Sequence, residues 1–157
     1  MKIAVLGVGA IGGVLVGALS KTKSEIICVS RRKTARLLSS GLVINTPEGE
    51  IEFVDSGRYE VIDSEKKPIY DNYIKSCDFS IVAGKTYSTY ELASIANDMT
   101  KDEGYVISIQ NGLGNIEIIS KLMGQDRTIG GSITHSSWRS DDGEVNWSGR
   151  GSLILGM

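Results

Sequence analysis

The sequence of 157 residues has few cysteines, little net charge and a single histidine, and each shortage argues against a class of protein. Cys28 and Cys77 are far apart and form no C-x-x-C motif, so we expect buried free thiols in a reducing compartment. The formal net charge of −2 argues against a general nucleic-acid-binding protein. His135 has no partner at the spacing of a metal site or a catalytic triad, so we expect it to be structural and expect no metal.

The sequence also lacks internal repeats and low-complexity stretches. With 41% hydrophobic and 23% charged residues, its composition is that of an ordinary soluble globular protein. A chain of this length can bury about 70% of its unfolded surface without disulfides or metals. We therefore expect one domain over residues 1–157, in the cytoplasm.

One long uncharged run, residues 3–19, follows Lys2. It resembles a signal-peptide core, and Gly13 and Gly17 form a G-x-x-x-G pattern that membrane helices use for packing. However, five glycines lie within eleven residues, which disfavours one continuous helix, and the run barely spans a bilayer. We therefore expect no membrane segment.

The start of the chain has the pattern of a dinucleotide site. Lys2–Leu6 predicts a short buried strand, Gly7, Gly9 and Gly12 form G-x-G-x-x-G, and Ala10–Leu19 predicts a helix. The first glycine allows a tight turn, the second lets a pyrophosphate approach the backbone at the helix N-terminus, and the third allows close packing. The candidate phosphate-binding residues are Gly7, Val8, Gly9, Ala10, Ile11 and Gly12.

The rest of the chain alternates strands with helices. We expect strands at 25–29, 42–45, 50–54, 60–62, 79–83, 105–109, 127–133, 144–147 and 152–155, and helices that end at Ser39 or span 88–99 and 116–123. Asn115 is expected to cap the last helix, and Trp138 and Trp147 to be packed. This order predicts an α/β fold, a Rossmann-type doubly wound, mostly parallel sheet with helices on both faces and an antiparallel, strand-rich C-terminal edge.

Four predicted strands end in loops with unusual residues, at 7–12, 30–33, 84–86 and 110–114. In an open α/β sheet the carboxyl ends of the strands share one edge, where ligands bind. Four such loops at one edge are more specific than any one of them. We expect the ligand site there.

The second loop bears on the choice of cofactor. An NAD site usually has Asp or Glu at the end of the second strand, about 20 residues after the glycines, to hold the ribose 2′-hydroxyl. This chain has Ser30, Arg31 and Arg32 there, with Lys33 and Arg36 nearby and no acid. Guanidinium groups suit adenine and a 2′-phosphate, so Arg31 and Arg32 favour NADP(H). The alternative is a basic helix start that faces water.

The third and fourth loops offer one candidate each. Gly84-Lys85-Thr86 imitates the end of a P-loop, but Phe79 stands where that motif needs glycine. Lys85 can instead reach the cofactor ribose or the substrate, the alternative being a surface lysine. Asn111 can present its amide to the nicotinamide or to a substrate oxygen, although Asn-Gly is also a common turn.

Five segments together resemble the N-terminal half of the ketopantoate reductase (2-dehydropantoate 2-reductase) family. They are MKIAVLGVGAIGG, VSRR, VAGKTYST, ISIQNGLGN and the closing run THSSWRSDDGEVNWSGRGSLILG. The resemblance covers nearly the whole chain, and the lysine motif followed by QNGLGN is more specific than the glycine fingerprint. Gly84 departs from the family, which often has a bulkier residue there.

This resemblance implies NADPH-dependent reduction of ketopantoate, a small 2-keto acid, to pantoate on the way to pantothenate. It implies that the glycine loop holds the pyrophosphate and that Arg31 binds the 2′-phosphate. Lys85 is implied to contact the cofactor ribose, and Asn111 the nicotinamide and the substrate, which makes these two the catalytic candidates. Ser137 matches a position that lines the cofactor.

The family also has a helical C-terminal domain that carries the proton-donating lysine and most substrate contacts. This sequence ends at Met157, where that domain would begin, so we expect NADPH binding with little or no reductase activity. We expect exposed apolar surface near residues 110–116 and at the C-terminus, and a homo-oligomer formed through it.

Two other functions fit the same residues. One is the NADP-binding domain of another two-domain dehydrogenase with a different substrate. The other is a non-catalytic NADP-binding module that regulates a partner. A short-chain dehydrogenase is unlike this chain, because no lysine follows a tyrosine by four residues.

Overall fold

The computed structural model describes residues 1–66 and 69–157 and has a seven-stranded main sheet. Its strands lie in the order β11-β8-β7-β6-β1-β2-β5 and all run parallel except β11, which pairs antiparallel with β8. Their bounds are β1 Lys2–Leu6, β2 Glu25–Ser30, β5 Glu60–Asp63, β6 Cys77–Val82, β7 Thr100–Ser108, β8 Thr128–Ile133 and β11 Leu153–Gly156. Counted along the chain, the six parallel strands have the order 3-2-1-4-5-6. This is the Rossmann arrangement, so the predicted fold class is confirmed.

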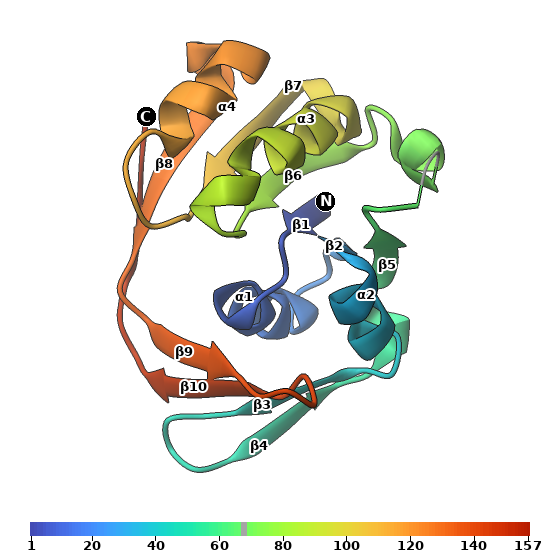
Figure 1. Cartoon of the computed structure of the whole chain (residues 1–157), viewed down its shortest axis with the longest axis vertical. Coiled ribbons are helices and arrows are strands. Elements are labelled where there is room, and N and C mark those ends of the chain that lie inside the picture. The colour runs from blue at the N-terminus through green and yellow to red at the C-terminus, as the bar shows by residue number, and fades with distance from the viewer. Residues whose placement is uncertain (67–68) are drawn as a thin grey trace.

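Helices cover both faces of this sheet (Figure 1). Helices α1 (Ala10–Ser20) and α2 (Arg32–Leu38) lie on one face, and α3 (Thr89–Met99) and α4 (Asn115–Met123) on the other. Each helix is held on the sheet by an apolar face, as α3 illustrates: its buried residues recur at helical spacing and pack on the sheet. These buried apolar residues are Leu92, Ala93, Ile95, Ala96 and Met99. Short 3₁₀ turns lie at Ser56–Arg58, Ile69–Tyr73, Thr86–Ser88 and Gln125–Arg127.

A second, four-stranded sheet lies beyond α1, in the order β4-β3-β10-β9 (Figure 1). Its strands are β3 Leu42–Asn45, β4 Ile51–Val54, β9 Ser136–Arg139 and β10 Val145–Gly149. The β3–β4 hairpin was predicted, but β9 was not, and the predicted strand at 144–147 pairs here rather than at the edge of the main sheet. A strand pattern reports local conformation and burial and does not identify the partner strand.

Helix α1 lies between the two sheets, and two of its glycines explain how it fits. A Cβ atom added to Gly13 would lie 2.6 Å from Val145 Cγ2, and one added to Gly17 would lie 2.3 Å from Ile44 Cδ1. The G-x-x-x-G pattern therefore allows close packing of α1 on β3 and β10. Among the described helices, none is long and apolar enough to cross a membrane.

Two smaller predictions, the start of β7 and the packing of Trp138, are wrong. Strand β7 begins at Thr100 instead of Tyr105, because the pairing of Thr100 with Cys77 and the hydrogen bond from Arg127 Nε to Gly104 O (2.9 Å) hold a polar segment that has no strand pattern. Trp138 was expected to pack but is 57% exposed. Trp147 packs against the core, as predicted. In the segment 55–72, for which the sequence predicts only the strand at 60–62, residues 67–68 lie outside the described residues.

The cap of α4 also differs from the prediction. Gly114, with a φ of +85°, is the N-cap, and Asn115 is the first helical residue. Its side chain is buried and bonds to neighbouring loops instead of the helix amides. A cap at Asn115 and a cap at Gly114 differ by one residue in where the helix begins, and sequence spacing alone does not distinguish helix starts that are so close.

Candidate functional site

A cleft of about 760 Å³ lies at the carboxyl edge of the main sheet, beside β1 and β6, where the strand order reverses. The four loops singled out in the sequence all contribute to its walls. The predicted site residues that line it are Gly7, Val8, Gly9, Ala10, Ile11, Arg31, Lys85, Asn111 and Ser137. Gly12 and Arg32 are the two candidates that do not line it.

The glycine loop is shaped by close backbone contacts. Gly7 has a φ of +79°, and a Cβ there would lie 2.5 Å from the Cα of Gly84, so both residues must be small for the two loops to meet. A Cβ on Gly12 would lie 3.1 Å from Gly7 O, which places Gly12 in the packing between helix and loop. A Cβ on Gly9 would meet no atom within 4 Å. Each glycine thus has the environment that a dinucleotide loop requires.

The N-terminus of α1 offers unpaired amide groups at the cleft. Gly9 is its N-cap and supplies no side-chain acceptor, and the first turn has no acidic residue. The first N–H groups of a helix have no acceptor within the helix and carry the positive end of its dipole, so they favour an anion. Val8 N donates to Ser30 Oγ (3.0 Å) and Gly7 N to Val29 O (2.8 Å), which fix the loop on β2.

Two buried hydroxyl groups test whether a dinucleotide fits the cleft. The Oγ atoms of Ser64 and Ser137 are buried and line the cleft, and neither has a hydrogen-bond partner within residues 1–66 and 69–157. Buried polar groups are normally paired, so both sites suit a ligand with polar groups along its length. With the open space at Gly9, these positions fit a dinucleotide. Sequence reasoning missed Ser64, which follows β5 directly and could have been found from its place at the strand end.

The two arginines after β2 point in different directions. The Arg31 guanidinium lies 3.3 Å from Glu91 Oε2 and 6.0 Å from the centre of the Tyr87 ring, both on the other wall of the cleft. Arg32 instead lies 4.0 Å from Asp63, outside the cleft. Arg31 is the N-cap of α2 and has an extended backbone, whereas Arg32 is the first helical residue, so the two side chains leave the backbone in different directions. Arg31 therefore lines the cleft and Arg32 does not.

The loops that carry Lys85 and Asn111 are joined by side-chain hydrogen bonds. Gln110 Nε2 donates to Gly84 O (2.9 Å) and to Thr89 Oγ1 (2.9 Å). Thr86 Oγ1 donates to Asn111 O (3.0 Å), which links the two loops a second time. Gln110 belongs to the QNGLGN segment, yet its positioning role has no signal in a single sequence.

Asn115 completes this network from the start of α4. It is 2% exposed, and its Nδ2 donates to Asn111 O (3.1 Å) and Gly112 O (3.3 Å). Its Oδ1 lies 2.8 Å from Thr89 Oγ1. The backbone that carries Asn111 is thus fixed from two sides, and the Asn111 side chain is exposed at the cleft.

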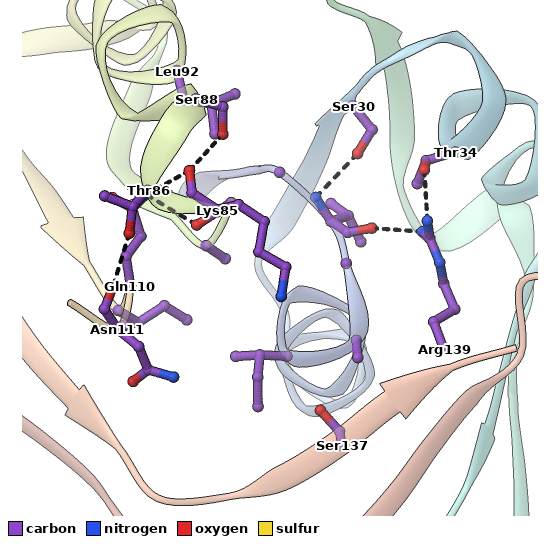
Figure 2. Close-up of a pocket in the computed structure, with 18 of the residues that line it drawn as sticks. Ser30, Thr34, Lys85, Thr86, Ser88, Leu92, Gln110, Asn111, Ser137 and Arg139 are labelled. Carbon is purple, nitrogen blue, oxygen red and sulfur yellow. Dashed lines mark hydrogen bonds between the residues drawn. The ribbon is translucent and has the colours of Figure 1, made fainter. Parts of the chain in front are cut away.

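Figure 2 shows how the side chains face one another across the cleft. Lys85 and Asn111 come from one wall, with the Lys85 side chain extended toward α1, and Ser137 and Arg139 come from β9 on the other. Arg139 donates to Val8 O (3.1 Å) and to Thr34 Oγ1 (3.0 Å), so it ties the second sheet to the glycine loop. It was not a candidate because β9 was not predicted.

His135 has the structural role that the sequence suggested, and it also borders the cleft. Its Nδ1 accepts from Trp147 Nε1 (3.2 Å) and from the backbone N–H of Gly151 (3.1 Å). With two donors on Nδ1, the proton of the neutral ring lies on Nε2. The imidazole therefore joins β10 to the segment that leads into β11.

Both cysteines are free and buried, as predicted. Burial raises the pKa of Cys28 to about 12 and also raises the pKa of Cys77. Such thiols are unreactive near neutral pH. Within the described part of the chain, no group of three or more His, Cys, Asp or Glu residues is placed to hold a metal ion.

A sequence model of the family described as ketopantoate reductase PanE/ApbA matches residues 3–157. The chain belongs to this family. Its members are oxidoreductases, and the predicted resemblance is confirmed.

Relatives within and near the family agree on the fold. The 2-dehydropantoate 2-reductase of Pyrococcus horikoshii is 32% identical over 158 residues, which cover 100% of this chain and 48% of that protein. The crystal structure of 2-dehydropantoate 2-reductase from Geobacter metallireducens GS-15 has a TM-score of 0.77 at 27% identity and covers 99% of this chain and 49% of its own. This chain thus spans about half the length of these ketopantoate reductases.

A structure with another substrate is also similar. It is the ternary structure of D-mandelate dehydrogenase with NADH and anilino(oxo)acetate, with a TM-score of 0.80 at 20% identity, over 99% of this chain and 48% of that one. At this identity the likeness concerns the fold alone.

Proposed function

We propose that this chain is the NADP(H)-binding part of a ketopantoate reductase, which reduces 2-dehydropantoate to pantoate in pantothenate biosynthesis. The observation that carries the choice of cofactor is Arg31, which lines the cleft at the end of β2, where an NAD site usually has an acid. A guanidinium there can bind a 2′-phosphate through two parallel N–H groups. Family membership supports the reaction.

Each wall of the cleft has a separate task in this proposal. The glycine loop and the amides at the start of α1 bind the pyrophosphate, and Ser64 and Ser137 donate to polar groups farther along the cofactor. Lys85 binds ribose oxygens, and Asn111 donates its amide to the oxygen of the ketone whose carbon accepts the hydride. Bound NADPH supplies that hydride.

The proton for the product alkoxide is proposed to come from outside this chain. In the family resemblance the donor is a lysine of the helical domain, and this chain spans about half the length of its relatives. The 157-residue chain should therefore bind NADPH and leave added ketopantoate unreduced. Steady NADPH oxidation that depends on ketopantoate would contradict this.

Fluorescence titration of the chain with NADPH and NADH tests the cofactor assignment. We expect NADPH to bind at least about tenfold more tightly, because a charge-assisted bidentate contact contributes about 1.5–3 kcal/mol. Arg31→Ala should weaken NADPH binding about tenfold to a hundredfold and change NADH binding less than about threefold.

Arg32→Ala is the matched control, since it removes the same charge one residue away, outside the cleft. It should leave the preference for NADPH in place. Tighter binding of NADH by the wild-type chain would overturn the assignment of NADP(H).

We also propose that the chain self-associates through exposed apolar residues. Leu113 is 97% exposed and Ile154, on β11, is 66% exposed, in the two regions where apolar surface was expected. Light scattering should show a mass that rises with concentration, and a clean monomer at high concentration would contradict this. The buried free thiols support the cytoplasmic location proposed with it.

A further inference from the structure

A carboxylate stands opposite the proposed 2′-phosphate site. Glu91 is in the first turn of α3, sixty residues from Arg31 along the chain, and its Oε2 lies 3.3 Å from Arg31 Nη2. Both side chains line the cleft, and 56% of the Arg31 side chain and 46% of the Glu91 side chain are exposed. The ion pair therefore joins the two walls at the mouth of the site.

This contact places a negative charge beside the proposed 2′-phosphate site, which is the position at which NADPH and NADH differ. Any group that bonds to Arg31 lies near the Glu91 carboxylate, since the two side chains are in contact. A phosphate monoester carries about −1.5 to −2 charges at pH 7, whereas a ribose hydroxyl is neutral and can donate to a carboxylate. Glu91 thus opposes a 2′-phosphate and tolerates a 2′-hydroxyl.

We propose that Glu91 is a specificity-determining residue that weakens NADPH binding and narrows the preference for NADPH over NADH that Arg31 provides. The proposal rests on the proposed binding of NADP(H) at this cleft. Glu91 acts in two ways. It occupies an N–H group of Arg31 that the phosphate would use, and its charge repels the phosphate across the cleft.

A simpler explanation is that Glu91 only stabilises α3, because an acid in the first turn of a helix interacts favourably with the helix dipole. The chain provides a matched control for that effect. Glu117 is the third residue of α4, as Glu91 is the third residue of α3, and it is exposed and does not line the cleft. Glu117→Gln removes the same charge from the same helical position.

The test compares Glu91→Gln with Glu117→Gln by titration with NADPH and with NADH at low ionic strength. Glu91→Gln should tighten NADPH binding about threefold to fivefold, the upper end of the range expected for a half-exposed charge pair, and change NADH binding less than about twofold. Glu117→Gln should change neither. At about 1 M salt the gain for NADPH should shrink, because charges farther apart than about 3 Å are then screened.

Two results would overturn the proposal: equal effects of Glu91→Gln on both cofactors, or weaker NADPH binding, which would mean that Glu91 orients Arg31 for the phosphate. Arg31→Ala, measured in parallel, separates this failure from failure of the proposed function. If Arg31→Ala weakens NADPH selectively while Glu91→Gln behaves like Glu117→Gln, only the assignment of Glu91 fails. If Arg31→Ala weakens both cofactors equally, the NADP(H) assignment itself fails.

Discussion

The glycine loop and the loops that carry Lys85 and Asn111 meet at the same cleft but are held in place by different means. The glycine loop is held by backbone bonds and by close contacts at positions without side chains, such as Gly7 against Gly84. The other two loops are held by amide and hydroxyl side chains, with Gln110 and Asn115 at the centre. Added atoms should therefore disrupt the first region, and removed atoms the second.

Gly7→Ala should have the largest effect. The new methyl group would face Gly84 Cα at 2.5 Å in a left-handed backbone conformation, and neither backbone can move without shifting a strand end. We expect a loss of roughly 3 kcal/mol or more in the free energy of unfolding, measured by urea denaturation.

Gly9→Ala is the control for that change. Its methyl group would meet no protein atom within 4 Å, so the free energy of unfolding should change by less than about 1 kcal/mol. NADPH binding should weaken, because the methyl group would stand where the pyrophosphate is proposed to lie. Equal destabilisation by the two substitutions would break the contrast between crowded and open positions.

Asn115→Ala should come next and tests the side-chain network. It would remove three hydrogen bonds, to Asn111 O, Gly112 O and Thr89 Oγ1, and each such bond contributes about 0.5–1.5 kcal/mol. We expect a loss of roughly 2–3 kcal/mol by urea denaturation. Asn111→Ala, at an exposed position of the same loop, should leave stability nearly unchanged and reduce ligand binding.

The two regions should also respond differently to alkaline pH. Cys28 pairs with Val5 beneath the glycine loop, and burial raises its pKa from 9.0 to about 12, whereas the network at Gln110 and Asn115 holds no titrating group. Because the pKa is raised in the folded state, the stabilisation is complete below pH 9 and is lost as the pH rises from about 9 to about 12.

Above pH 9, the free energy of unfolding should fall by about 1.4 kcal/mol per pH unit because of the Cys28 thiol. Cys28→Ala should make the decline shallower. An unchanged slope in that variant would assign the alkaline loss to other groups, such as Tyr59, whose pKa burial also raises to about 12.

Ser64→Ala should have the smallest effect on stability, because its hydroxyl has no partner among residues 1–66 and 69–157. We expect a change within about 0.5 kcal/mol, with NADPH binding weakened about threefold to tenfold. Ser80→Ala is the contrast, since its buried hydroxyl accepts from Thr100 (2.8 Å). That variant should lose about 1 kcal/mol of stability and keep its NADPH affinity.

The main sheet could be predicted because each of its strands is recognisable from its own local sequence. Runs such as 2–6 and 79–83 are apolar and are followed by glycine, and their alternation with helices determines the parallel topology. The second sheet could not, because β9 has the sequence SSWR and β10 pairs with β3 about a hundred residues away. Pairing between strands so far apart in the sequence depends on the packing of α1 between the two sheets, and local sequence patterns carry no information about that packing.

The candidate site divides in the same way. Residues at strand ends, such as Gly7, Arg31 and Lys85, could be placed at the cleft from the sequence because the carboxyl ends of parallel strands share one edge of the sheet. Glu91 and Arg139 were missed because they enter from a helix turn and from the second sheet. Arg32 was included because its neighbour Arg31 has the same charge, although Arg31 is the extended N-cap of α2 at the cleft and Arg32, the first helical residue, lies beside Asp63.

Helix α1 lies between the two sheets, so its thickness sets how far apart the walls of the cleft are. Its glycines at 13 and 17 let the second sheet approach, and that sheet carries Ser137 and Arg139 to the side of the glycine loop opposite Lys85. A bulky residue at either glycine would act as a spacer, pushing one wall of the cleft outward without touching the ligand. Substitutions at these two glycines, which do not contact the ligand, should therefore change the affinity for the cofactor.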